Sequence, residues 1–282
     1  MQRLYNISVL PGDNFIDAIP VLYAPFEKYV VGVIPLMLEH VWQQKNSSSS
    51  NTAELLMKSG WIGRLITLDK RVLDVSEQNN IEGWPKLRGN LIDHIDNCRS
   101  SDDVNKMVAS CMLLIAPLLE KRFKHGYTFP VRPFHSWWYT IHNDNKELAL
   151  HLVNAYQPAS PFDNLDHFLQ NMLKAVEHAI KLYPGINKVS CGSWLNGVPK
   201  FQQLWPKSFT QNQRILNKSN GFGPGAWGQY MTLDGGFNSG KSNILRKTGL
   251  HPYVLTEAHS PLEEVLSHLG KIIANPTLIN HE

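Results

Sequence analysis

The sequence predicts an α+β protein, with a helical N-terminal part in residues 1–128 and a mixed, mostly antiparallel sheet flanked by helices in residues 129–282. Three observations support this class. Apolar residues recur at helical spacing in the first part, aromatic and β-rich runs begin after Pro130, and helix and strand patterns then alternate. The chain has 282 residues, 43% of them apolar, which is enough for one large domain or two small ones.

Two helices are expected in the first part. Residues 21–44 carry apolar side chains at spacings of three and four, interrupted at Pro35, which predicts a kinked buried helix or a helix pair. The run 46–51 (NSSSSN) is typical of a solvated linker. A second helix is predicted from about 102 to 124, acidic in its first turn and basic in its last. Cys111 lies on its apolar face, so we expect this thiol to be packed in the core.

The second part should open with a β-hairpin. Residues 134–142 (FHSWWYTIH) and 147–156 (ELALHLVNAY) are aromatic and β-rich, and residues 143–146 (NDNK) between them tolerate the left-handed conformation of a tight turn. Asp163 can then cap a helix that ends near Leu182, before a Tyr-Pro-Gly stop.

Shorter elements complete the predicted layer. A strand is expected at 188–193, a short helix at 198–204 and a strand at 226–233. Residues 260–263 (SPLE) read as a capping box that opens a last helix through Ile273.

Charge and cysteine content restrict the partners. Lys+Arg number 27 and Asp+Glu 24, a net charge of +3 without the clustered excess that a phosphate backbone needs, so we expect no nucleic-acid partner. The apolar run 29–38 is broken by a proline, is too short to span a bilayer and lacks signal-peptide flanks. Cys98, Cys111 and Cys191 are far apart and odd in number, which argues against a disulfide framework or a thiolate zinc site. We expect a cytoplasmic protein without membrane association.

A phosphate-loop pattern occurs near the C-terminus. Residues 235–242 (GGFNSGKS) satisfy GxxxxGK[ST], in which backbone amides and the lysine hold phosphates and the serine holds Mg²⁺. Such a loop follows the first strand of a parallel sheet, but only 40 residues (282 − 242) remain for the other strands. We therefore favour a turn-rich loop and keep a nucleotide hydrolase as an alternative.

Two other strings carry a resemblance. Residues 136–142 (SWWYTIH) and 191–196 (CGSWLN), with the order hairpin, helix, strand, helix, strand, resemble a bacterial group of two-part N-acyltransferases. In that group a helical part precedes a GNAT-like domain; the resemblance covers residues 134–205. It implies biosynthetic transfer of an acyl group to a small amine. The thioester of coenzyme A, or of an acyl carrier protein acting as a partner, would be the co-substrate, with no permanently bound cofactor.

The junction between the hairpin and the next helix departs from the GNAT pattern. In that family the junction is a Gly-containing loop that binds the pyrophosphate of acyl-coenzyme A; here it is 157–162 (QPASPF). Gln157 matches the first position of the loop. Ser160 and Pro161 replace the opening glycine, and the proline removes an amide donor. Ordinary coenzyme A binding is therefore in question.

Direct acyl transfer needs a base for the amine proton and a donor for the developing oxyanion. The hairpin and the next strand offer four candidates: His135, His142, His151 and Cys191. Strand alternation puts His135 and His142 on opposite faces, so only one can be central. His151, in mid-strand, is the best base candidate, and Cys191 is a possible thiol nucleophile assisted by a histidine. A hydrogen-bonded structural histidine and a small buried cysteine remain the simpler interpretations.

Substrate contacts are expected from the polar and aromatic residues of the same segments: Trp137, Trp138, Tyr139, Tyr156, Gln157, Ser193 and Trp194. The twelve histidines show no metal-ligand spacing, so we predict no metal site. A different class of function remains open. The same aromatic sheet surface could bind a peptide or protein partner without catalysis.

Overall fold

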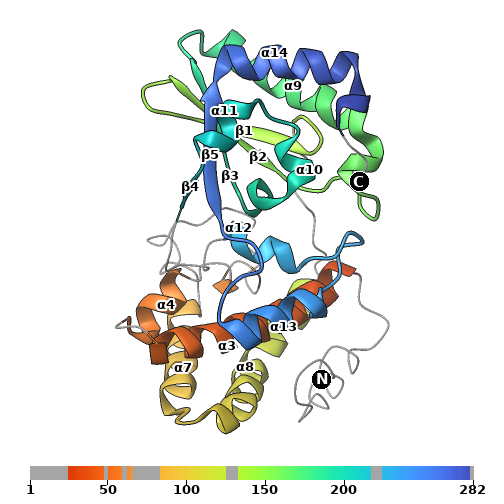
Figure 1. Cartoon of the computed structure of the whole chain (residues 1–282). Helices are drawn as coiled ribbons and strands as arrows, with labels where there is room; N and C mark the ends of the chain where they lie inside the picture. Colours follow the sequence, from red (N-terminus) through yellow and green to blue (C-terminus); the bar gives the residue numbers. More distant parts are fainter. Residues whose placement is uncertain are drawn as a thin grey trace. The chain divides into compact units, whose positions relative to one another are not determined.

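The computed structural model describes residues 25–47, 50–58, 62–63, 65, 83–124, 133–216 and 224–279 (Figure 1). It is an α+β structure, as expected, with a helical N-terminal region and a five-stranded mixed sheet packed with helices. The chain forms two compact units. Met1–Thr128 and Asn220–Pro252 make up the first, and Phe129–Ser219 and Tyr253–Glu282 the second. The second expected domain, 129–282, is thus interrupted by a segment that packs with the helical unit.

The first unit is a bundle of helices. Its elements are α3 (Pro25–Ser47), α4 (Thr52–Lys58), α7 (Trp84–Asn97), η1 (Ser101–Asp103), α8 (Val104–Lys124), α12 (Pro224–Trp227), η4 (Gly228–Tyr230) and α13 (Ser239–Thr248). Helix α3 continues through Pro35, so the expected interruption does not end it. The second expected helix is confirmed as η1 followed by α8.

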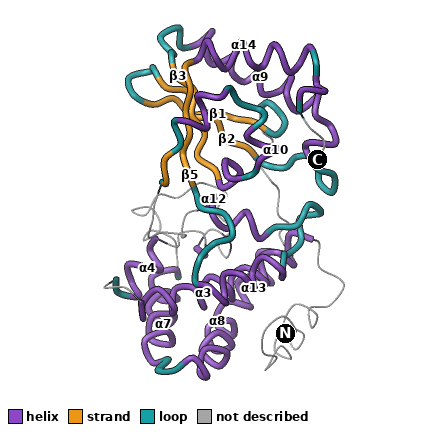
Figure 2. Tube along the Cα trace, viewed as in Figure 1, coloured by secondary structure: helices purple, strands orange, loops and turns teal. Residues whose placement is uncertain are grey.

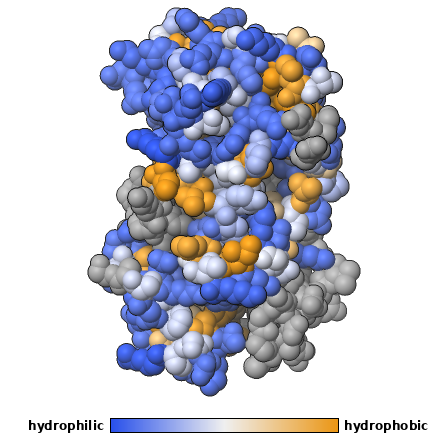
Figure 3. Space-filling model, in the orientation of Figure 1, coloured by the Kyte–Doolittle hydropathy of each residue, from blue (hydrophilic) through white to orange (hydrophobic). Residues whose placement is uncertain are grey.

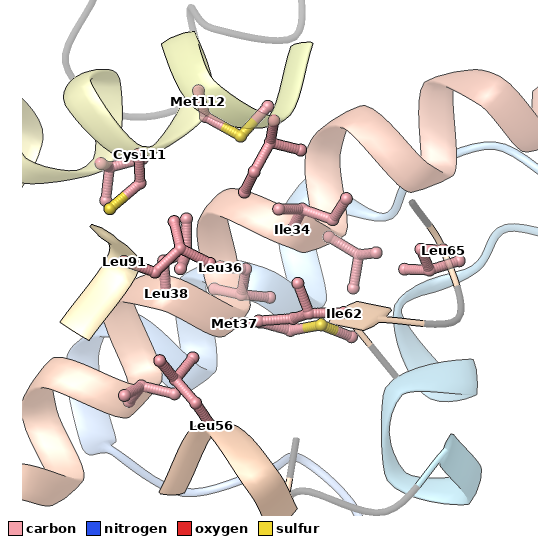
Figure 4. Packing of buried hydrophobic residues seen from close by; sticks show 14 of the residues in the cluster. Ile34, Leu36, Met37, Leu38, Leu56, Ile62, Leu65, Leu91, Cys111 and Met112 are labelled. Carbon is pink, nitrogen blue, oxygen red and sulfur yellow. The ribbon is translucent and has the colours of Figure 1, made fainter. Parts of the chain in front are cut away.

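Figure 4 shows the core of this unit, where side chains of α3 meet those of α4, α7 and α8. Cys111 of α8 is fully buried there, and burial raises its thiol pKa to about 12, as expected for a packing residue. Gly32 of α3 admits an aromatic ring, because a Cβ atom at this position would lie 2.4 Å from Cγ of Phe237.

The predicted strand at 226–233 is wrong. These residues form the helical turns α12 and η4, and only Met231 makes a β-bridge, to Phe237. Trp227 and Tyr230, three residues apart, are both fully buried in the helical core. Packing of the two rings on one side therefore outweighs the β propensity of the run.

The sheet belongs to the second unit (Figure 2). Its strands are β1 (Trp137–His142), β2 (Glu147–Leu152), β3 (Lys188–Ser193), β4 (Arg214–Ile215) and β5 (Thr256–Pro261), in the order β1-β2-β3-β5-β4. Only β2 and β3 run parallel; the other neighbours are antiparallel. The predicted hairpin and the strand at 188–193 are confirmed. The hairpin turn has positive φ angles at Asn143, Asp144 and Asn145.

Helices and short turns fill the rest of the second unit. They are η2 (Pro161–Asn164), α9 (Leu165–Leu182), η3 (Trp194–Gly197), α10 (Pro199–Gln202), α11 (Lys207–Gln211), α14 (Leu262–Ala274) and η5 (Pro276–Leu278). Helices α9 and α14 supply Phe168, Leu169, Val265 and Leu269 to a core shared with one face of the sheet.

Strand alternation gives the sheet two chemically different faces. The helix-packed face carries buried side chains, namely Trp137, Leu148, Leu150, Val189, Cys191 and Ala258. The opposite face, called the polar face below, carries Trp138, Thr140, His142, Glu147, His151, Lys188 and Ser190.

The last helix is confirmed, but its predicted capping box is wrong. Ser260 lies in β5, in register with Val189, and α14 begins at Leu262 without a side-chain cap. Strand β5 was not predicted. Its buried positions are Thr256, Ala258 and Ser260, which give no apolar alternation in the sequence.

Among the described residues, no helix is both long enough and apolar enough to cross a membrane. In the view of Figure 3 the surface is mostly hydrophilic, and apolar residues gather in small separate groups.

Candidate functional site

The parallel strands β2 and β3 separate at their carboxyl ends. They are in register over four residue pairs only, from Glu147↔Lys188 to Leu150↔Cys191. Beyond this point β2 stays paired with β1 through Leu152, and β3 stays paired with β5 through Ser193. We call the gap in register, bounded by His151 and Leu152 of β2 and by Gly192 and Ser193 of β3, the strand opening. The opening lies at the carboxyl ends of the two parallel strands and is bordered by His151, so we take it as the candidate site.

Local hydrogen bonds direct each strand away from the other. After β2, the amide of Val153 donates to the carbonyl of Ser136 at 3.0 Å, and the amide of Ala155 donates to the Ser136 hydroxyl at 3.3 Å. Both bonds hold this chain to the start of β1. After β3, the Asn196 side-chain amide donates to the carbonyls of Cys191 at 2.9 Å and Thr256 at 3.0 Å.

The N–H groups of a strand point alternately to its two neighbours. Because the amide of Val153 points toward β1, the amide of Leu152 points toward β3. Leu152 lies beyond the last pair of the β2–β3 ladder, which ends at Leu150. Its N–H is therefore directed into the strand opening.

His151 borders the opening on the polar face. Its Nε2 lies 2.9 Å from Oγ1 of Thr140, and the same oxygen lies 3.0 Å from Nε2 of His142. The ring of Trp138 stacks on that of His151, with centroids 5.2 Å apart. The stacking and the hydrogen bond together restrain the orientation of the His151 imidazole.

Sequence reasoning missed Thr140. The signal was present, since the four-residue turn sets the register Thr140↔Ala149 and so puts His151 diagonally opposite Thr140 on one face.

An ion pair lies at the other end of this face. Lys188 Nζ is 2.6 Å from a carboxylate oxygen of Glu147, and the Asn143 amide donates to the same carboxylate at 2.5 Å. Burial alone would raise the pKa of Glu147, but hydrogen bonds to Lys188, Ser190 and Asn143 and the charge of Lys188 lower it. The carboxylate therefore stays charged and neutralises Lys188.

His135 does not belong to the group of polar-face side chains formed by Thr140, His142 and His151. It lies in a turn before β1 with φ 58°, so the strand alternation expected to orient it does not apply. Its ring contacts those of Tyr156 and His167, with centroids 4.5 Å and 5.0 Å away. The Tyr156 hydroxyl lies 2.8 Å from Nδ1 of His167. Burial and the neighbouring His167 lower the pKa of His135.

Cys191 does not face any of the candidate histidines of β1 and β2. Its side chain lies on the helix-packed face, whereas His142 and His151 are on the polar face. The residue is 1% exposed, and burial raises the pKa of the thiol to about 12. The geometry corresponds to a packing residue rather than to a thiolate nucleophile.

The expected substrate contacts are dispersed. Trp137 is a core residue whose indole N–H donates to the carbonyl of Phe168 at 3.1 Å. The Tyr139 hydroxyl forms a hydrogen bond with Nδ1 of His178, and the rings of Trp194 and Tyr253 are in contact, with centroids 5.4 Å apart. Gln157 lies in the exposed junction after β2 and Tyr156 beside His135. Of the set, Trp138 and Ser193 lie next to the strand opening.

The phosphate-loop string lies in the first unit and does not form a phosphate cradle. Its first two residues lie in a tight turn, in which the amide of Thr232 donates to the carbonyl of Gly236 at 2.8 Å, and no described strand of the sheet leads directly into it. The Asn238 side chain caps α13 by accepting from the amide of Lys241 at 3.0 Å. The buried Ser242 hydroxyl donates to the carbonyl of Ser239 at 2.7 Å. The Lys241 amide and the Ser242 hydroxyl, which would bind phosphate and Mg²⁺, thus form hydrogen bonds within the helix terminus.

In the part of the chain that the structure describes, no three His, Cys, Asp or Glu side chains are grouped so as to hold a metal ion. Comparisons of the chain with known protein families, with curated proteins and with solved structures found no match.

Proposed function

We propose that this chain is an N-acyltransferase that moves an acyl group from a coenzyme A or carrier-protein thioester to a small amine. The observation that carries the proposal is the strand opening between β2 and β3. An extended pantetheine arm can enter between two strands only where their ladder stops. Here the ladder stops beside a histidine and a backbone amide directed into the gap.

The groups at the opening match the needs of the reaction. His151 would accept the proton that the amine loses as it attacks the thioester carbonyl. The amide of Leu152 would donate to the oxyanion that forms on that carbonyl. Collapse of the tetrahedral intermediate breaks the carbon–sulfur bond, and the leaving thiolate takes the proton that His151 accepted from the amine, which returns the imidazole to its neutral form.

Apolar surface for an acyl chain lies at the same place. A Cβ atom at Gly192 would lie 3.2 Å from Cδ1 of Leu216, so Leu216 covers the polar face beside the opening. Leu216 is 38% exposed and the neighbouring Ile215 46%. Burial of such surface by an acyl chain is favourable by about 25 cal/mol per Å².

The experiment compares two matched glycine variants of the full chain. Gly192→Val adds a branched side chain beside the opening, where Cδ1 of Leu216 already lies 3.2 Å from Cβ, and Gly185→Val adds the same side chain in an exposed turn, where the nearest described atom is 3.7 Å from Cβ. Acyl transfer from thioesters to a panel of small amines is measured by thiol release. We expect transfer by the wild type and by Gly185→Val, and loss in Gly192→Val. Equal activity of the two variants, or no transfer with any thioester, would contradict the proposal.

A second candidate function is peptide binding without catalysis, which the position of β1 at one end of the described sheet favours. An extended peptide can add a strand to such an edge, with Trp138 as an aromatic contact. Binding of peptides that Gly192→Val leaves unchanged, together with absence of thiol release, would support this alternative.

A further inference from the structure

Several backbone amides of the junction between β2 and α9 donate to groups within the junction itself. The amide of Ser160 donates to the Asp163 carboxylate at 2.9 Å, and the amide of Phe162 donates to the Ser160 hydroxyl at 3.2 Å. The amide of Asp163 donates to the carbonyl of Ser160 at 3.0 Å. Pro158 and Pro161 have no N–H. These groups are satisfied internally in a reciprocal capping box, which leaves them no donor for a ligand.

The charge of the junction also disfavours a polyanion. Asp163 in η2 and Asp166 in the first turn of α9 place two carboxylates at the helix start, where a phosphate would otherwise be stabilised. Lys200 brings one positive charge, with Nζ 5.2 Å from the ring centroid of Phe162. Two carboxylates against one lysine therefore disfavour a ligand that carries several negative charges.

We propose that the acyl donor is a pantetheine thioester without a nucleotide diphosphate, the prosthetic arm of an acyl carrier protein. This inference rests on the proposed acyl transfer and names its donor class. The junction follows the strand opening directly along the chain, at the carboxyl end of β2, where the distal end of a pantetheine arm in the opening would emerge. A carrier arm ends in one phosphodiester charge, which Lys200 can balance. Coenzyme A carries in addition a diphosphate and a 3′-phosphate. The carboxylates of the junction would repel these groups, and its amides that already have partners would not bind them.

Two measurements on the full chain test the donor class. The first is binding of the nucleotide half of coenzyme A alone, 3′-phosphoadenosine 5′-diphosphate, by calorimetry. We expect no binding at millimolar concentration. Binding would overturn the proposal whether or not acyl transfer is detected.

The second measurement is kcat/KM for the same acyl group on pantetheine, on coenzyme A and on a carrier protein. We expect kcat/KM with acyl-coenzyme A to be no more than about threefold higher than with acyl-pantetheine. With the acylated carrier protein, kcat/KM should be at least about tenfold higher than with either, since one ion pair or hydrogen bond is worth about 1–2 kcal/mol. A larger preference for coenzyme A over pantetheine, or a carrier protein no better than coenzyme A, would overturn the donor class. Absence of transfer from all three would instead overturn the proposed function.

A gain-of-function variant gives an independent check. Ser160→Gly with Asp163→Asn removes the cap and one carboxylate, and should raise kcat/KM for acyl-coenzyme A about tenfold while leaving acyl-pantetheine unchanged. Asp144→Asn, which removes a carboxylate in the hairpin turn, is the matched control and should change neither. Equal values for acyl-coenzyme A in the double variant and the wild type would contradict the role given to the junction.

Discussion

Acid should destabilise the first unit through one buried histidine. His40 of α3 is 3% exposed, and its ring contacts those of Trp227 and His251, with centroids 5.8 Å and 5.4 Å away. The Tyr230 hydroxyl lies 2.7 Å from Nδ1 of His251, so the cluster joins α3 to the segment that returns from the second unit. Burial, and secondarily His251, lower the pKa of His40 from 6.5 to about 3.

The sign and size of the effect follow from linkage. The unfolded chain binds a proton at His40 below pH 6.5, whereas the folded protein does so only near pH 3, so stability falls as the pH falls through this window. A pKa shift of this size lowers the free energy of unfolding by about 2 kcal/mol between pH 7.5 and 5, and by roughly 4 kcal/mol between pH 7.5 and 3.

Hydrogen exchange of the α3 amides, followed by mass spectrometry, measures this stability within the first unit. His40→Gln removes the titrating ring. Between pH 7.5 and 5 the free energy of unfolding should therefore fall by about 2 kcal/mol more in the wild type than in this variant. His94→Gln, which removes a half-buried imidazole of α7 in the same unit, should behave as the wild type. An equal pH dependence in the wild type and His40→Gln would refute the argument that burial keeps this ring neutral.

Three further predictions concern packing, proton placement and thiol reactivity. Gly32→Ala should destabilise the first unit by about 1–3 kcal/mol in denaturant unfolding, because the added methyl group overlaps an aromatic ring. Gly89→Ala in α7 should stabilise it by about 0.5–1 kcal/mol, because no described atom outside the backbone of α7 lies within 4 Å of its Cβ. Long-range ¹H–¹⁵N NMR above the histidine pKa values should show opposite tautomers in the two rings bridged by Thr140, since one hydroxyl has one proton to donate, and the same tautomer in Thr140→Val. Cys191 should not react with an aromatic disulfide reagent at pH 8 in the folded protein, because burial raises its pKa; reaction within minutes would contradict the burial.

The sequence contains enough local information for the long helices α3, α8, α9 and α14 and for the hairpin, whereas α4 and α7 were not predicted. Helix α9 has a regular apolar stripe, and the Asn-Asp-Asn-Lys turn lies between two β-rich runs, so neighbours in sequence suffice to define these elements. The same turn puts Trp138 and His151 on one face of the hairpin. The aromatic residues expected to form one surface are nevertheless dispersed over the second unit. The prediction of a strand at 226–233 is wrong because packing against a helical core that is remote in sequence outweighs the β propensity of these residues.

The strand opening, by contrast, was decided by tertiary structure. It exists because β3 pairs with β5, more than 60 residues later, and because β5 is built from threonine, alanine and serine at its buried positions, which carry no strand signal of their own. The opposite orientations of Cys191 and His151 likewise depend on the parallel register of β2 and β3. Periodicity along the chain reports which side chains share a face of one element, whereas the partner of a strand, and the point where pairing ends, depend on contacts between segments that the sequence order keeps apart.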